Sequence, residues 1–230
     1  NSGSNIILGI NNGNDCAVYY STNNGVSFTL GFSLATGGTP ESVRNVAIDG
    51  TTLLAVTQEG TNILIRNSLD SGATWNVRLT QATLIGTNIS LSGTNALFTA
   101  VSAGNGFIRY SSNSGTTWNT PTTTPTLTSV NLARVSISGS VGMIGGSVTS
   151  NAFIWYSLDG GNIWTNSTFA QANTTIIASI SASGTNGLIA INTSVSGTGV
   201  LYYSTNSGVT WTLANSYAST NINNASLDGS

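Results

Sequence analysis

The chain has 230 residues, of which 39% are hydrophobic and only 5% are charged, and its formal net charge is −2. Five arginines without a lysine do not form the cationic surface that nucleic-acid binding requires, and no apolar run approaches the roughly 18 residues of a membrane span. The chain has no histidine and one cysteine, Cys16, which excludes a Ser-His-Asp triad, a histidine-based zinc site and an internal disulfide. We therefore predict no metal, no cofactor, no nucleic-acid partner and no membrane insertion.

Taken in chain order, the expected elements are short strands separated by glycine-containing turns, without the 3.6-residue period of a helix. Residues 2–11 match a turn and a second strand. Paired first and second strands are then expected at 45–56, 88–101, 135–146 and 180–191, third strands at 63–68, 107–112, 153–157 and 200–204, and fourth strands at 74–79, 117–120, 163–166 and 210–214. The final residues, 224–230, match the first strand that the N-terminus lacks.

Between the third and fourth strands the chain repeats one pattern five times, Ser-x-Asp/Asn-x-Gly-x-x-Trp/Phe, which we call the box. The five boxes lie 43 to 47 residues apart, a period typical of propellers and solenoids. Their defining residues are Ser21, Asn23, Gly25 and Phe28; Ser68, Asp70, Gly72 and Trp75; Ser111, Asn113, Gly115 and Trp118; Ser157, Asp159, Gly161 and Trp164; and Ser204, Asn206, Gly208 and Trp211.

This order of elements predicts an all-β fold, a five-bladed β-propeller of four-stranded antiparallel blades. The expected single domain covers 1–230, with blades at 1–35 plus 222–230, 43–82, 86–122, 133–169 and 178–216. Since each end holds a fragment of one blade, we expect the N- and C-terminal strands to pair and close the ring, which would leave no open edge. An open array would begin and end at similar places, so closure is an inference from the pattern.

The boxes identify the chain as similar to the Asp-box family, also called bacterial neuraminidase repeats, along its whole length. That resemblance implies that each box is an outer turn on the face away from any active site. The residues support a structural role as well, because the third position alternates between Asp and Asn, and Asn neither titrates nor supplies a charge. We therefore expect the Asp or Asn to accept hydrogen bonds in its turn and the Trp to anchor neighbouring blades.

Sialidases of the family resemble one another in an arginine triad, a Tyr–Glu nucleophilic pair and an Asp acid/base, and none of these maps onto this chain. No arginine precedes an Ile-Pro pair, and of the seven acids only Asp15, Glu41 and Glu59 are expected on the face opposite the boxes. We therefore predict no enzymatic activity and no catalytic residues, with a glycoside hydrolase as the third hypothesis. Cys16 is interpreted as a small core residue.

Two sets of residues are candidates for ligand binding. Flat side chains precede each box serine by two positions, and they either stack on sugars or fill the gaps between blades: Tyr19, Arg66, Arg109, Trp155 and Tyr202. Polar loops opposite the boxes add Asp15, Glu59, Asn105, Asn151 and Asn192, and their alternative is ordinary solvated loop.

From these residues we predict a surface recognition or adhesion module that binds a glycan through the face opposite the boxes. The alternative is a structural module of a virion, filament or surface layer, whose partner is a surface protein and which assembles into a larger structure. The lysine-free composition, rich in Ser, Thr and Asn, indicates an extracellular, cell-surface or virion-surface location.

Overall fold

A computed structural model describes residues 2–35, 41–128, 130–148, 151–169, 174–193 and 197–227, and the chain forms antiparallel strands without a helix in these ranges. The first sheet consists of β1 (Ile6–Asn12), β2 (Asp15–Ser21) and β3 (Thr29–Leu34). The second consists of β4 (Glu41–Asp49), β5 (Thr52–Glu59), β6 (Asn62–Ser68) and β7 (Asn76–Ala82). The third consists of β8 (Ile85–Ser92), β9 (Asn95–Ser102) and β10 (Asn105–Ser111).

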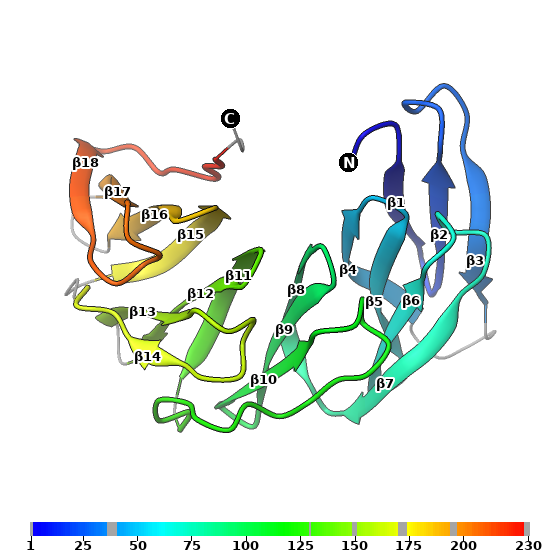
Figure 1. Cartoon of the computed structure of the whole chain (residues 1–230), viewed down its shortest axis with the longest axis horizontal. Helices are drawn as coiled ribbons and strands as arrows, with labels where there is room; N and C mark the ends of the chain where they lie inside the picture. The colour runs from blue at the N-terminus through cyan, green and yellow to red at the C-terminus, as the bar shows by residue number, and fades with distance from the viewer. Residues whose placement is uncertain are drawn as a thin grey trace.

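The last two sheets repeat the four-stranded order. The fourth sheet consists of β11 (Asn131–Ser138), β12 (Val141–Val148), β13 (Asn151–Ser157) and β14 (Thr165–Asn166). The fifth consists of β15 (Thr174–Ser183), β16 (Asn186–Thr193), β17 (Gly199–Ser204) and β18 (Thr212–Tyr217). Figure 1 shows the five sheets side by side along an arc, with both termini on its open side.

The prediction of four strands in every blade is wrong for the first and third sheets, which have three each in the described part of the chain. In the third repeat the expected fourth strand is reduced to one bridge between Tyr110 and Asn119. The chain then turns toward the next sheet, where the Thr122 amide donates to the Asn162 carbonyl at 3.0 Å and Thr123 bridges Ile163. The segment therefore joins two sheets instead of completing one.

Apolar residues that alternate along the strands fill the spaces between neighbouring sheets. The core accordingly divides into clusters, one for each pair of adjacent sheets. Representative members are Val18 and Ala55 for the first pair, Leu54 and Phe98 for the second, Leu97 and Ile144 for the third, and Met143 and Ile189 for the fourth. Each sheet is therefore stabilised by its neighbours more than by itself.

Small residues of the innermost strands also join the sheets through hydrogen bonds. In each case a serine hydroxyl accepts a backbone amide hydrogen from the next repeat: Ser90 from Ile137 at 3.1 Å, Ser136 from Ala182 at 3.0 Å, and Ser181 from Leu227 at 3.0 Å. These serines therefore link the innermost strand of each repeat to the next repeat.

The C-terminal residues 222–227 occupy the place that the first strand of a further sheet would take. The Asn192 side chain donates to the Ile222 carbonyl at 3.0 Å and accepts the Ile222 amide hydrogen at 2.8 Å. Asn11 holds Val43, which lies in the first strand of the second sheet, by the same pair of bonds. Residues 222–227 therefore continue the array beyond the fifth sheet.

The predicted closure of the ring is not observed in the described residues. β1 pairs with β2 alone, and residues 222–227 bond to the fifth sheet, through Ser179, Ser181 and Asn192. Figure 1 shows the two termini facing each other across the open side of the arc. The spacing set by the repeated bonds between sheets leaves this side open, and residues 228–230 lie outside the described range.

Candidate functional site

The array of sheets has two faces, one at each end of the strands. We call the face that carries the box turns the box face, and the opposite one the loop face. On the box face each box turn bonds to the first hairpin turn of its own sheet, as when the Ser71 amide donates to Thr51 at 2.9 Å and the Gly160 amide to Ser140 at 2.9 Å. The loop face holds the connections between second and third strands and between successive sheets. The acids that are not used in turns of the box face lie here.

Each box turn is stabilised by hydrogen bonds between residues of the same box. The serine hydroxyl donates to the Asp or Asn side chain at 2.8 Å for Ser21, 2.7 Å for Ser68, 2.9 Å for Ser111, 2.8 Å for Ser157 and 3.0 Å for Ser204. The box glycine has a positive φ, 107° at Gly161, where a Cβ atom would lie 2.3 Å from the Leu97 side chain. Only glycine therefore permits both the turn and its close contact with the preceding sheet.

A cavity of about 480 Å³ lies at the loop-face end of the innermost strands. Its lining residues are Arg44, Asn45, Ile63, Leu84, Ile85, Asn88 and Arg134. None of these is acidic, so two arginines give this axial cavity a positive charge. Arg44 donates to the Gln58 side chain, and the Arg134 Nε donates to the Ala178 carbonyl at 2.8 Å, which fixes both side chains at the rim.

The ligand-binding residues predicted from the sequence do not include those that line this cavity. The sequence does contain an indication of a polar cavity, because the same position of successive first strands is occupied by Asn45, Asn88 and Arg134. A polar residue repeated at one position of the innermost strand indicates a polar axis. The sequence alone did not show that the arc opens enough there for a cavity.

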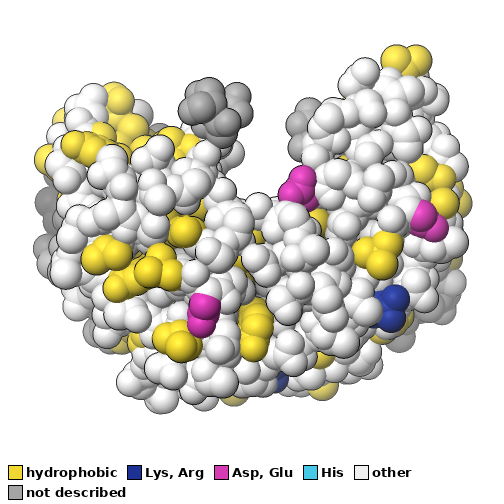
Figure 2. Space-filling view, viewed as in Figure 1, with side chains coloured by type: hydrophobic (Ala, Val, Ile, Leu, Met, Phe, Trp, Pro, Cys, Tyr) yellow, Lys and Arg dark blue, Asp and Glu magenta, His cyan; other side chains and the backbone are white. Residues whose placement is uncertain are grey.

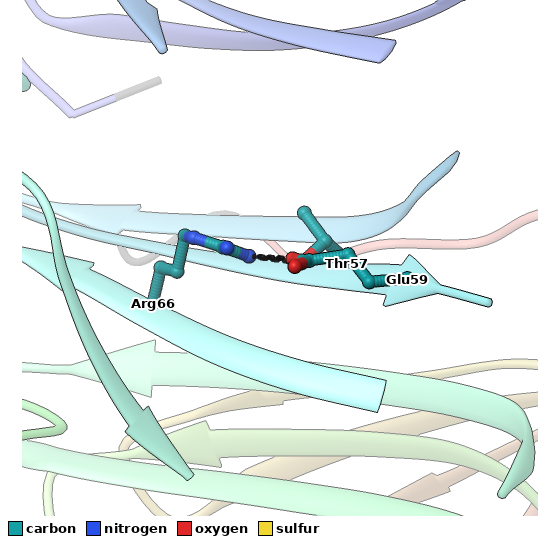
Figure 3. Close-up of polar contacts among 3 residues, drawn as sticks. All are labelled: Thr57, Glu59 and Arg66. Carbon is teal, nitrogen blue, oxygen red and sulfur yellow. Dashed lines mark hydrogen bonds and ion pairs between the residues drawn. The ribbon is translucent and has the colours of Figure 1, made fainter. Parts of the chain in front are cut away.

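Two of the predicted ligand residues, Glu59 and Arg66, meet between the first and second sheets. Figure 3 shows Arg66 directed at Thr57 and Glu59, with the Arg66 Nη1 donating to the Thr57 hydroxyl and paired with the Glu59 carboxylate. The Arg66 side chain is only 11% exposed, and its guanidinium lies 5.1 Å from the centre of the Phe32 ring. The Phe32 ring of the first sheet therefore covers one face of the Arg66 guanidinium.

Carboxylates gather around this ion pair. Glu41, which is 3% exposed, lies directly opposite Glu59 in the ladder of β4 and β5. Burial raises the pKa of the Cys16 thiol, and the negative charges of Glu41, Glu59 and Asp15 raise it further. The structure thus brings together the three acids that the sequence assigned to the loop face.

Two other predicted ligand residues, Asp15 and Tyr19, line a second cavity of about 350 Å³ with Ile10 and Asn12. This cavity lies on the first sheet, on the face turned away from the second sheet. Its walls are the side chains that a preceding sheet would cover in a longer array. Asp15 and Tyr19 are close to each other but are not part of the axial cavity.

The remaining flat side chains fill gaps between sheets. Trp155 is 3% exposed and stacks on Phe153 with ring centres 4.3 Å apart, so of its two predicted roles the burial supports the filling of a gap between sheets. The Arg109 guanidinium lies 4.0 Å from the centre of the Phe107 ring, and burial lowers its pKa. Tyr202 packs edge-on against Phe169, and burial raises its pKa.

The predicted asparagines lie apart from one another. Asn105 and Asn151 are exposed and begin β10 and β13, whereas the Asn192 side chain is hydrogen-bonded to the backbone of Ile222. In the described ranges no group of three or more Cys, Asp or Glu is suited to hold a metal ion. A search of the same ranges for a long apolar helix that could cross a membrane finds none.

No protein-family model matches the chain, and no curated protein matches its sequence. Solved structures resemble its fold. The GH74 xyloglucanase of Xanthomonas campestris matches with a TM-score of 0.65 and 13% identity, over 92% of this chain and 36% of that one. The GH74 enzyme of Niastella koreensis matches with a TM-score of 0.61 and 17% identity, over the same shares. YCF48 bound to a D1 peptide matches with a TM-score of 0.50 and 13% identity, over 91% and 83%.

These likenesses show a β-propeller type of fold, and the chain spans about a third of the length of the two GH74 enzymes. The prediction that the chain is not an enzyme is contradicted, because glycoside hydrolases are among the structures that it resembles. At such low identity a shared fold does not transfer an activity. What stands is the propeller type of fold, and the chemistry of the chain must be argued from its own residues.

Proposed function

We propose that the chain is a saccharide-binding β-propeller whose binding site is the axial cavity of the loop face. The observation that carries the proposal is the lining of that cavity, where Arg44, Arg134, Asn45 and Asn88 surround apolar walls. A cavity of about 480 Å³ lies within the range of about 300–1,000 Å³ that is typical of ligand pockets. The likeness to a xyloglucanase supports a glycan as its ligand.

The chemistry of the lining suits a sugar. Guanidinium and amide groups present several donors to hydroxyl or carboxylate oxygens, and asparagine oxygens accept hydrogen bonds from hydroxyls. Ile63, Leu84 and Ile85 offer apolar surface to the C–H faces of the ring. Because the lining has no acid, a neutral or acidic sugar is favoured over a cationic amino sugar. Exposed loop residues such as Asn105 and Asn151 would contact a longer chain, in keeping with a protein of an extracellular, cell or virion surface.

The test is a glycan array that includes xyloglucan fragments and uronic acids, followed by calorimetric titration of the best ligand. We expect Arg44→Gln to weaken binding roughly tenfold or more, since a hydrogen bond to a charged group contributes about 1.5–3 kcal/mol. Arg78→Gln removes the same charge from β7, outside the cavity, and should leave affinity unchanged. No binding across the array, or equal losses in both variants, would refute the proposal.

Hydrolysis is tested in the same samples by measuring the release of reducing ends. A glycosidase of this kind needs two carboxylates that face each other across the bond that is cleaved. Glu41 and Glu59 are directly opposed in the ladder of β4 and β5 and are therefore the pair to test. If the protein cleaves a glycan, Glu59→Gln should abolish cleavage, and unchanged cleavage in that variant would exclude this pair.

A second candidate function is protein binding within a larger surface assembly. It is supported by the likeness to YCF48 bound to a peptide, since this chain covers 83% of that structure. A peptide array run beside the glycan array separates the two functions. Peptide binding that Arg44→Gln leaves intact, without glycan binding, would favour this second candidate.

A further inference from the structure

The fourth box, residues 157–164, differs from the other four at its seventh position, among other changes. Its seventh residue is Ile163, where the others have a hydroxyl residue that bonds to the Asp or Asn of the same box. Those bonds join Asn23 to Ser27 at 2.9 Å, Asp70 to Thr74 at 2.6 Å, Asn113 to Thr117 at 3.0 Å, and Asn206 to Thr210 at 2.8 Å. Ile163 has no group that could make this bond.

The substitution leaves one carboxylate oxygen of Asp159 available. Its Oδ1 accepts the Ser157 hydroxyl at 2.8 Å and the amides of Asn162 and Ile163, each at 3.0 Å. Its Oδ2 receives no hydrogen bond from the residues that the structure describes. In the second box the corresponding oxygen of Asp70 accepts the Thr74 hydroxyl instead.

Asp159 lines a cavity together with mostly apolar side chains. This cavity of about 290 Å³ is lined by Tyr156, Ser157, Leu158, Asp159, Ile163 and Thr165, and we call it the fourth-box cavity. Leu158 is 55% and Ile163 is 48% exposed; Leu69, the counterpart of Leu158 in the second box, is also exposed, whereas no other box has an apolar residue at the position of Ile163. Figure 2 shows hydrophobic side chains gathered near an acidic one over the fourth sheet. The Ser157 hydroxyl is buried and already bonded within the box, so it is not offered to a ligand.

We propose that the fourth-box cavity binds a lysine or arginine side chain of a partner protein. The methylene stem of such a side chain would lie on Leu158 and Ile163 while its charged head reaches the Asp159 Oδ2, and the Tyr156 ring adds a surface for the cation. The chain has no lysine, and each of its five arginines is bonded or stacked on residues outside this cavity, so the occupant comes from another molecule. A sugar fits less well, because the cavity offers few free polar groups for several hydroxyls. This site is on the box face and does not depend on the saccharide proposal.

Two variants of Asp159 and Ile163 provide the test, and each places in the fourth box a residue that other boxes already carry. Asp159→Asn removes the charge, and three of the other boxes have Asn there. Ile163→Thr adds the hydroxyl that all four other boxes have at this position, as a threonine in three of them. Both variants are therefore expected to fold, which an amide proton–nitrogen NMR spectrum checks. Asp70→Asn makes the same charge change in the second box and serves as the matched control.

The probe is n-butylguanidinium, with neutral n-butylurea as its counterpart, titrated while the methyl NMR signals of Leu158 and Ile163 are recorded. Because a single exposed ion pair is weak, we expect saturation only at millimolar concentrations of the guanidinium. Asp159→Asn should weaken binding at least fivefold, as followed at the methyl groups of both Leu158 and Ile163. Ile163→Thr should weaken it by a similar factor, as followed at Leu158 alone. The control Asp70→Asn should leave binding unchanged.

Three results would overturn the proposal. The first is an equal response to n-butylurea, which would show that the charge has no part in binding. The second is unchanged binding by Asp159→Asn. The third is a saturable response of the same methyl groups to methyl glucoside at concentrations where the guanidinium gives none, which would assign the cavity to a sugar.

Discussion

The second and fourth boxes share the same pattern and both carry an aspartate, yet they hold its carboxylate differently. Asp70 uses both oxygens inside its turn, since Oδ1 accepts the Ser68 hydroxyl and the Thr74 amide, and Oδ2 accepts the Thr74 hydroxyl. Asp159 uses only its Oδ1 for hydrogen bonds inside its turn, and the residue lines the largely apolar fourth-box cavity. One residue, four positions further along the chain, decides whether the carboxylate is fully used by the fold.

The electrostatics of the two carboxylates follow their hydrogen bonds. The Thr74 side chain and amide, with the Ser68 hydroxyl, lower the pKa of Asp70 from 3.8 to about 2. For Asp159 burial acts to raise the pKa, but the Ile163 amide, the Ser157 hydroxyl and neighbouring amides together lower it. The two boxes therefore keep the same turn geometry, although only the second uses both oxygens of its aspartate to stabilise the turn.

The largest expected difference between the two boxes concerns their tryptophans. Trp164 is 2% exposed and its indole donates to the Gly161 carbonyl at 2.7 Å, whereas Trp75 is only partly buried. Trp164→Ala should therefore cost about 3–5 kcal/mol of unfolding free energy, and Trp75→Ala clearly less. Urea unfolding followed by circular dichroism measures both. Equal losses would mean that the two boxes anchor their sheets alike.

A reciprocal exchange tests the residue that separates the boxes. Ile163→Thr should stabilise the protein, by up to about 1 kcal/mol, because it completes the hydrogen bonds of Asp159 and removes an exposed apolar side chain. Thr74→Ile should lower the unfolding midpoint, because it removes the bond to the Asp70 Oδ2. The same urea measurement gives both signs. A loss of stability in Ile163→Thr would show that Ile163 packs in a way that the cavity does not reveal.

The smallest expected effect is in the pH dependence of stability. Because the pKa of Asp70 is lowered from 3.8 to about 2, its contribution is fully present above about pH 4 and is lost as the pH falls toward 2. The unfolding midpoint of the wild type should therefore approach that of Asp70→Asn over this window. Carboxyl carbon NMR should show Asp159 titrating at higher pH than Asp70, and the reverse order would contradict the bonds described here.

Part of the fold could be predicted because local rules specify it. The alternating apolar residues predicted the strands, and the boxes predicted where third strands turn back. The missing fourth strand after Trp118 could not be predicted, since it depends on the bond from Thr122 to Asn162 in another sheet. Ring closure also depends on angles that build up over successive sheets, and the matching terminal sequences did not reveal them.

The candidate site was predicted only in part, for a similar reason. Asp15, Glu41 and Glu59 were assigned to the loop face and are near one another, because the direction of each strand fixes which end its residues occupy. For Trp155 the sequence left open an exposed sugar platform and burial between sheets, and the structure buries it. The axial cavity is formed by four strands that are far apart in the chain, β4, β6, β8 and β11, so no local pattern predicts it.

By itself the sequence determined the repeat, the box turns and the strand order, because these depend on hydrogen bonds and side-chain alternation within a few residues. Only the tertiary structure decided the open arc, the cavity between Arg44 and Arg134, and the largely apolar cavity that Asp159 lines. Those features depend on how neighbouring sheets meet, and the distances between sheets are set by packing over the whole array.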